Sequence, residues 1–220
     1  MSKIIFSDVD GCIINNQPPN FLLINDYLQR AISSGFNIVL ASAKTAHELI
    51  KLNQSLNLPG PFIIENGAGI LFKGTIPKSF PNNETIPLDG YNILKLVKDK
   101  PNINVLSSLC TPDSLLTQMS DQKLCAVTGL SVQDAVLAKA RFFTEPVYIK
   151  NLTDLSLKLS KAKLRKAKFY FIQTNRFLHI STSKRNHKGR AIKFLLEQFY
   201  ANEICQNFAI GDSFNDFSML

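Results

Sequence analysis

The first 65 residues alternate between short apolar segments and segments with helical spacing, and this rhythm limits the folds open to the chain. The apolar runs 4–6, 36–41 and 61–64 are expected to be buried strands. Between them, 21–34 and 45–57 place apolar residues at helical intervals. Strands that alternate with helices form a parallel sheet with helices on its faces. The sequence therefore predicts an α/β fold with a parallel sheet.

Polar residues follow each of these predicted strands. Asp8 and Asp10 follow the first strand, Ser42 follows the second, and Glu65 and Asn66 follow the third. The carboxyl ends of parallel strands lie at one edge of a sheet, and ligands bind there. We therefore expect these five side chains to share one functional site.

The rhythm is lost after residue 80 and returns near residue 185. Three prolines and an Asn-Asn pair give 76–87 the composition of a linker. We predict a first core segment at 1–80, an inserted α+β domain at 81–184 and a second core segment at 185–220. The insert is expected to hold helices at 132–140 and 154–168, a strand at 147–149 and a hairpin of 169–173 with 177–182, and the second core segment a helix at 188–199 and a strand at 208–210.

The run Asp8-Val9-Asp10-Gly11 carries the strongest chemical signal. Alternation along an extended segment puts the two carboxylates on the same side of the chain. Such a pair needs a cation or a shared proton, and Mg²⁺ accepts carboxylate oxygens while leaving room for a phosphate oxygen. One carboxylate can attack phosphorus while the other acts as general acid and base. The alternative is a pair of solvated loop aspartates.

Three other positions add to this chemistry. The run 211–216 offers oxygen ligands from Asp212, Asn215 and Asp216, although an Asx-rich turn that caps a helix has the same composition. Lys188 opens a predicted helix and can neutralise a phosphoryl group and Asp8, unless it is a surface lysine. The Ser42 hydroxyl can hold a phosphate at a helix start, or serve as a helix N-cap.

Composition excludes several classes of protein. No apolar run approaches the length of about 20 residues that spans a bilayer, and the N-terminus leads directly into a strand, so a cytoplasmic location is expected. The four cysteines and three histidines are scattered, which argues against zinc and for reduced thiols. Residues 139–193 hold 15 Lys or Arg against two acids, an excess of +13, while the whole chain carries +8. This basic segment indicates an anionic ligand, a solvated helix face or, as a different class of function, a nucleic-acid-binding module with a silent core.

Taken together and in this order, the four motifs resemble those of the haloacid dehalogenase (HAD) superfamily of phosphohydrolases. The resemblance implies a Rossmann-like HAD core, Mg²⁺ and an inserted α+β type-two cap domain. It implies that Asp8 is the nucleophile and Asp10 the acid and base, with Lys188 beside them. The metal ligands would be Asp8, the backbone carbonyl of Asp10 and Asp212, with Asn215 and Asp216 in support.

A narrower resemblance is to the mannosyl-3-phosphoglycerate phosphatase branch of that superfamily. It rests on 42–48, 61–68, Thr128 to Pro146 in the expected cap and 176–189. It implies a small phosphorylated substrate, a sugar phosphoglycerate, gripped by Ser42, Lys44, Glu65, Asn66, Arg141 and Arg176. A structural salt bridge is the alternative role for the two arginines, and a generic sugar phosphate or sucrose phosphate is the alternative substrate.

This chain departs from the branch at two places that matter for the site. His187 stands where the branch generally has Asp before Lys-Gly. The chain also ends at Leu220, soon after the fourth motif, whereas relatives generally continue, so the second core segment is expected to be truncated.

Overall fold

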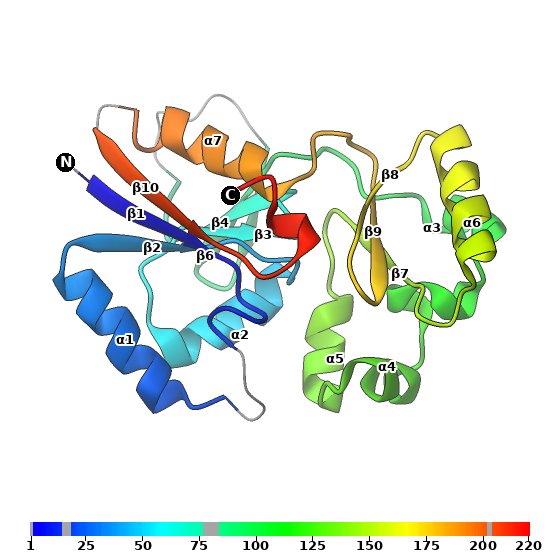
Figure 1. Ribbon diagram of the computed structural model, residues 1–220, viewed down its shortest axis with the longest axis horizontal. Coiled ribbons are helices and arrows are strands. Elements are labelled where there is room, and N and C mark those ends of the chain that lie inside the picture. The colour runs from blue at the N-terminus through cyan, green and yellow to red at the C-terminus, as the bar shows by residue number, and fades with distance from the viewer. Residues whose placement is uncertain (1, 15–18, 77–83, 202–203) are drawn as a thin grey trace. The chain divides into compact units, whose positions relative to one another are not determined.

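The computed structural model describes residues 2–14, 19–76, 84–201 and 204–220, and the chain divides into two units (Figure 1). One unit joins Met1–Leu96 to His187–Leu220, and the other is Val97–Asn186. Most of the linker-like segment 76–87 lies outside the described residues. The domain boundaries at residues 81 and 185 stay predictions from the sequence.

The first unit contains the predicted parallel sheet. Strand β1 (Ser2–Ser7) lies between β2 (Phe36–Leu40) and β10 (Cys205–Ile210), and both pairings are parallel. Ser7 pairs with Leu40 on one side and with Ile210 on the other, so the three strands end at the same level. The predicted Rossmann-like core is confirmed.

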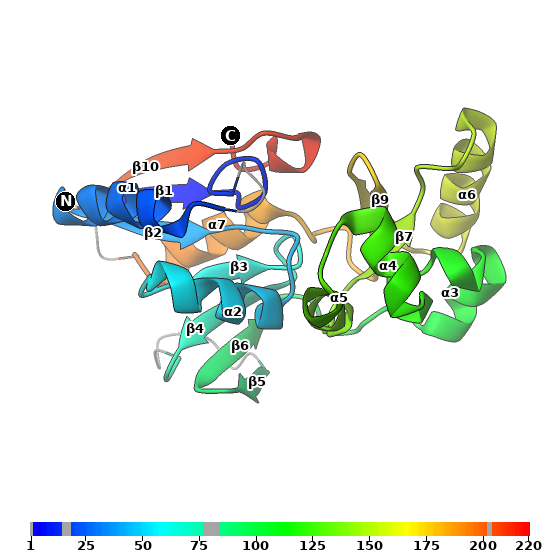
Figure 2. The same ribbon diagram turned by 90° about the horizontal axis from the view of Figure 1, so that it is seen from below.

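The sheet continues with antiparallel strands that the sequence analysis did not predict. A parallel bridge between Ala41 and Ile63 connects β2 to β3 (Phe62–Ile64). Beyond it the order is β3-β4-β6-β5, all antiparallel (Figure 2). Pairing with β4 therefore places residues 85–95 in the first unit. The added strands are β4 (Gly69–Lys73), β5 (Thr85–Leu88) and β6 (Tyr91–Lys95).

Three helices cover this sheet, with α1 (Phe21–Ser33) and α2 (Ala46–Leu56) on one side and α7 (Lys188–Gln198) on the other (Figure 1). All three were predicted to within two residues at each end. Each has a side-chain N-cap that accepts a backbone N–H, which satisfies one of the donors a helix start leaves unpaired. The buried stripe of α7, which includes Ala191 and Leu195, packs on Ile4 and Phe6 of β1.

The second unit is an α+β domain built on a three-stranded antiparallel sheet. Its order is β7-β9-β8, and β8 and β9 form the predicted hairpin. Leu178 and Ile180 of β9 pack with Leu106 and Leu164 from two helices, whereas Phe177 packs in a separate cluster. Because side chains alternate in direction along β9, this strand contributes to a cluster on each face of the sheet. The elements are α3 (Ile103–Leu109), α4 (Asp121–Thr128), α5 (Val132–Lys139), β7 (Glu145–Tyr148), α6 (Asp154–Lys166), β8 (Tyr170–Gln173) and β9 (Phe177–Ser181).

The basic segment centres on α6. Its Lys161 and Arg165 lie over the Phe171 ring at 5.9 and 5.2 Å from the centroid, and most of its other basic side chains face solvent. Within the residues that the structure describes, no helix has both the length and the apolar character needed to cross a membrane.

Candidate active site

The polar residues at the strand ends of the first unit come together. The backbone N–H of Asp8 donates to Ile210 O at 2.9 Å, which brings the end of β1 to the end of β10. The N–H of Ser42 donates to Ile63 O, and the N–H of Asn66 donates to Ser42 O, both at 2.9 Å. These backbone bonds hold the segments that follow β1, β2, β3 and β10 at one edge of the sheet.

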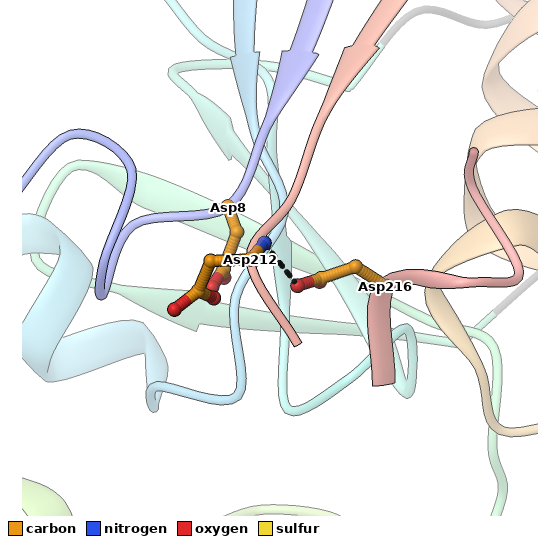
Figure 3. Close-up of side chains that lie close together, drawn as sticks. All are labelled: Asp8, Asp212 and Asp216. Carbon is orange, nitrogen blue, oxygen red and sulfur yellow. Dashed lines mark hydrogen bonds between the residues drawn. The ribbon is translucent and has the colours of Figure 1, made fainter. Parts of the chain in front are cut away.

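Three carboxylates meet at this edge (Figure 3). One oxygen from each of Asp8, Asp212 and Asp216 lies within 4.8 Å of the others, although 204 positions separate the first two in the chain. Asp8 and Asp216 are buried, whereas Asp212 is exposed. Gly11 is required beside them, because its φ is +87° and a Cβ there would lie 2.1 Å from Asp212 Oδ2.

Lys188 is the cation that the two buried carboxylates share. Its Nζ is fully buried and donates to Asp8 Oδ1 and to Asp216 Oδ1, each at 2.6 Å. Burial nevertheless raises the pKa of Asp8 to about 6, because desolvation and the repulsion of Asp216 outweigh the attraction of Lys188. Three carboxylates thus meet beside this one shared lysine, an arrangement that suits a divalent cation.

Asp216 differs from the other two carboxylates in how its oxygens are used. Its Oδ1 accepts from Lys188, and its Oδ2 accepts from the backbone N–H groups of Asp212 and Ser213 at 3.1 and 3.0 Å. Both oxygens are thus engaged within the protein (one of these bonds is drawn in Figure 3). Asp216 fixes the loop that carries Asp212, and Asp8 and Asp212 present their carboxylates to a cation more freely.

Asp10 lies beyond the end of β1, so strand alternation does not set the direction of its side chain. Strand β1 ends at Ser7, and the chain then turns, with Gly11 N–H donating to Ile14 O at 2.8 Å. The Asp10 side chain is 60% exposed and pairs with Lys44 Nζ at 3.0 Å. Burial lowers the pKa of Lys44, but the attraction of Glu48, Asp10 and Asp8 outweighs this and raises it. Asp10 is therefore held by a charged lysine at the margin of the carboxylate cluster.

Ser42 is fully buried and is not a helix N-cap. Its Oγ accepts from Lys44 N at 3.2 Å, whereas the N-cap of α2 is Thr45, which forms a capping box with Glu48. Thr45 was predicted as the first residue of this helix but not as its N-cap, although the Thr-x-x-Glu spacing marks a capping box. The capping box fixes the start of α2 and so the backbone on both sides of Lys44.

The segment 65–67 forms a strained turn that is bonded to the loop of Asp212. Glu65, Asn66 and Gly67 have φ of 47°, 60° and 95°, a left-handed run that is costly outside glycine. Asn66 Oδ1 accepts from Asn215 Nδ2 at 3.2 Å. Both amides are buried, so this bond ties the turn to the loop of Asp212.

Comparison with known proteins agrees with this arrangement. The family model for haloacid dehalogenase-like hydrolases matches residues 5–220. The chain belongs to this family. The order of the four motifs predicted an enzyme of the HAD superfamily, and that prediction is confirmed.

Two proteins with sequences similar to that of this hydrolase are named as phosphatases. A glucosyl-3-phosphoglycerate/mannosyl-3-phosphoglycerate phosphatase of Persephonella marina is 30% identical over 99% of this chain and 81% of its own length. A mannosyl-3-phosphoglycerate phosphatase of Pyrococcus furiosus is 26% identical over 100% of this chain and 87% of its own.

Among solved structures, a haloacid dehalogenase-like hydrolase from Bacteroides thetaiotaomicron has a TM-score of 0.67 at 18% identity, over 100% of this chain and 85% of its own. A sugar phosphatase of HAD subclass IIB has a TM-score of 0.65 at 15% identity over 100% and 84%. These two structures share the fold of this hydrolase.

Arg141 and Arg176 lie in the second unit of the hydrolase. The Nε and Nη2 of Arg141 donate to Thr144 Oγ1 at 3.0 and 2.9 Å, and the residue is buried. Arg176 Nη1 donates to the backbone oxygens of Val127 and Thr128, where α4 ends, at 3.3 and 3.1 Å. Arg176 thus caps a helix C-terminus through these two bonds. A role of either arginine in substrate binding stays a prediction.

The start of α7 leaves no room for a side chain at Gly189. A Cβ there would lie 1.7 Å from Ser218 O, and the Gly189 N–H donates to Ser218 Oγ at 3.1 Å. No motif marks Ser218 in the sequence. Because the clash is with backbone, either the segment 216–220 or the first turn of α7 must move, and Lys188 and Asp216 lie in these two segments.

We therefore expect Gly189→Ala to lower both stability and hydrolysis. In an open helix this substitution would stabilise by about 1 kcal/mol, because alanine has the higher helix propensity. Here we expect destabilisation of about 1–3 kcal/mol from overpacking, with a fall in kcat. Chemical unfolding and steady-state kinetics measure the two effects. The control is Lys193→Ala, on an exposed face of the same helix, and equal behaviour of the two variants would contradict the clash.

Proposed function

We propose that this hydrolase is a Mg²⁺-dependent phosphomonoesterase that works through an aspartyl-phosphate on Asp8. The observation that carries the proposal is the convergence of Asp8, Asp212 and Asp216 with the buried Lys188. Three carboxylate oxygens within 4.8 Å of one another fit a hard divalent cation that takes oxygen ligands. Asp8 and Asp212 would hold Mg²⁺ together with the Asp10 backbone carbonyl, and Asn215 and Asp216 would support them. When bound, the ion would offset charge on the phosphoryl oxygens.

The proposed chemistry has two steps. A carboxylate oxygen of Asp8 attacks phosphorus, and the bond to the ester oxygen breaks as that oxygen takes a proton from Asp10. In the second step Asp10 takes a proton from water, the water oxygen attacks phosphorus, and the bond from phosphorus to Asp8 breaks. Inorganic phosphate leaves, and Asp8 is a carboxylate again. Lys188 keeps Asp8 ionised and offsets negative charge in both steps.

For the substrate, we propose a sugar phosphoglycerate such as mannosyl-3-phosphoglycerate. Support comes from the names of relatives that align over the whole of this chain at 25–30% identity. Ser42, Glu65 and Asn66 are buried and Lys44 is partly buried, and these residues follow β2 and β3 at the same sheet edge as the carboxylate cluster, with hydrogen-bonding groups that suit a sugar. Arg141 and Arg176 are the proposed partners for the glycerate carboxylate, since a guanidinium binds a carboxylate through two donors.

A panel of phosphate esters with Mg²⁺ tests the substrate. We expect kcat/KM for mannosyl- and glucosyl-3-phosphoglycerate to exceed that for mannose 6-phosphate and sucrose 6-phosphate by roughly tenfold or more, the effect of one charge-assisted hydrogen bond. Equal rates across the panel would favour a generic sugar phosphatase. No hydrolysis of any ester, combined with salt-dependent binding to nucleic acid, would favour the silent binding module.

A further inference from the structure

Helix α7 begins with an unusual cap. His187 is its N-cap, and the imidazole Nδ1 accepts the backbone N–H of Arg190 at 3.2 Å. Ser, Thr, Asp and Asn are the preferred residues at this position, because each offers an oxygen that always accepts. A histidine nitrogen accepts only without a proton, so the proton of neutral His187 sits on Nε2. The cap therefore exists in one protonation state only.

The residue that this cap precedes is Lys188. Other contacts hold the chain on either side of the lysine: Gly67 is packed so closely on His187 O that a Cβ would lie 2.4 Å from it, and Gly189 N–H donates to Ser218 Oγ. The N–H of Arg190 is shared between His187 O and the His187 ring, each at 3.2 Å, so the ring supports the first helical turn together with the backbone. The direction in which Lys188 leaves the backbone depends on that turn, and its two bonds to Asp8 and Asp216 depend on that direction.

The charges around His187 disfavour its protonated form. Partial burial and the charge of Arg190 lower the pKa of His187 from its ordinary value of 6.5. The positive end of α7 acts in the same direction. Lys188 on the same helix is also cationic, and Glu65 is the acid of the turn that packs on His187 through Gly67. Because the folded pKa is lowered, the stability linked to His187 is complete above pH 6.5 and is lost as the pH falls through the lower folded pKa.

We propose that His187 is a positioning residue that aligns Lys188 with Asp8 by capping α7 as a neutral imidazole, and that protonation of His187 releases the lysine. The catalytic part of this statement rests on the function proposed above. The capping part concerns the helix alone and can be measured without any substrate.

The first arm of the test follows the helix. Hydrogen–deuterium exchange of the peptide from Lys188 to Leu195 is compared between pH 5 and pH 8 in the parent protein, His187→Asn and His187→Ala. Asparagine keeps an acceptor that does not titrate, and alanine removes it. We expect α7 of the parent protein to match His187→Asn at pH 8. As the pH is lowered to 5 it should open more often than His187→Asn, by up to about fivefold and toward His187→Ala, since a fully lost N-cap shifts such an equilibrium by about that factor.

The second arm follows hydrolysis in the same three proteins. The ratio of the kcat of the parent protein to that of His187→Asn removes the pH dependence that the two proteins share and leaves the part that depends on His187, including any effect of Lys188 on Asp8. We expect this ratio to fall several-fold from pH 8 to pH 5 with little change in KM, and His187→Ala to have a low kcat at both pH values.

The outcomes separate the two proposals. If exchange behaves as expected and no ester is hydrolysed, the capping role stands and the proposed function fails. If hydrolysis occurs but the ratio of exchange or of kcat between the parent protein and His187→Asn does not change with pH, the role of His187 is overturned. Exchange in His187→Ala equal to that in His187→Asn would overturn it as well.

Discussion

Asp8→Asn is expected to abolish hydrolysis while the protein remains folded. An amide is a poor nucleophile and cannot form the acyl phosphate, so we expect kcat to fall on the order of 10⁴-fold or more. The fold should persist because asparagine has the shape of aspartate and Lys188 keeps its bond to Asp216 at 2.6 Å. Steady-state kinetics and circular dichroism measure the two parts of this result.

The same substitution should stabilise the protein when no divalent cation is bound. The pKa of Asp8 is raised to about 6, so ionising this buried carboxylate costs folding free energy as the pH rises from about 4 to about 6. A pKa raised by two units corresponds to a loss of up to about 3 kcal/mol of folding free energy when Asp8 ionises. The neutral amide of Asp8→Asn does not ionise and so avoids this loss. In chelator at pH 7 we therefore expect the unfolding midpoint of Asp8→Asn to lie above that of the parent protein.

The control for this experiment is Asp26→Asn. Asp26 is half exposed and pairs with Arg30 on the surface of α1, so its amide should change neither hydrolysis nor the pH dependence of stability appreciably. Appreciable hydrolysis by Asp8→Asn would exclude Asp8 as the nucleophile. A lower midpoint for Asp8→Asn in chelator would show that the Lys188 pair outweighs the desolvation of Asp8.

Removal of divalent cations is expected to stop hydrolysis reversibly. Without a cation, the charge of Asp8, Asp212 and Asp216 is offset at this point only in part, by Lys188. We expect EDTA to abolish turnover and Mg²⁺ to restore it. Because a ligand that binds only the folded state stabilises it, Mg²⁺ at 100 times its Kd should add about 2.7 kcal/mol to the unfolding free energy.

Asp212→Asn tests whether the Asp212 carboxylate is one of the groups that bind Mg²⁺ in that experiment. The Asp212 side chain is exposed, and its backbone N–H is held by Asp216, so the amide should leave the fold intact and remove one charged ligand. We expect the midpoint of Mg²⁺ activation to rise at least about tenfold for Asp212→Asn, and to stay unchanged for Glu197→Gln, an exposed acid on α7. Full activity in EDTA, or an unchanged Mg²⁺ midpoint in Asp212→Asn, would contradict the metal site.

Local patterns in the sequence were enough to place most of the core. Apolar runs and helical spacing gave β1, β2 and α2, because these signals depend on residues a few positions apart. Polar residues after each strand indicated a shared edge, since parallel strands align their carboxyl ends. The strands β4, β5 and β6 were missed, because pairing partners rather than periodicity define short strands of this kind.

The sequence by itself determined which groups are available for chemistry: carboxylates at 8, 10, 212 and 216, a lysine at 188 and a histidine before it. Tertiary structure alone decided how they are used. Asp10 pairs with Lys44, both oxygens of Asp216 are occupied, and Lys188 reaches Asp8 across 180 positions of chain. The reason is that spacing along the chain fixes only local geometry. Contacts between distant segments follow from sheet pairing, helix packing and the burial of charge.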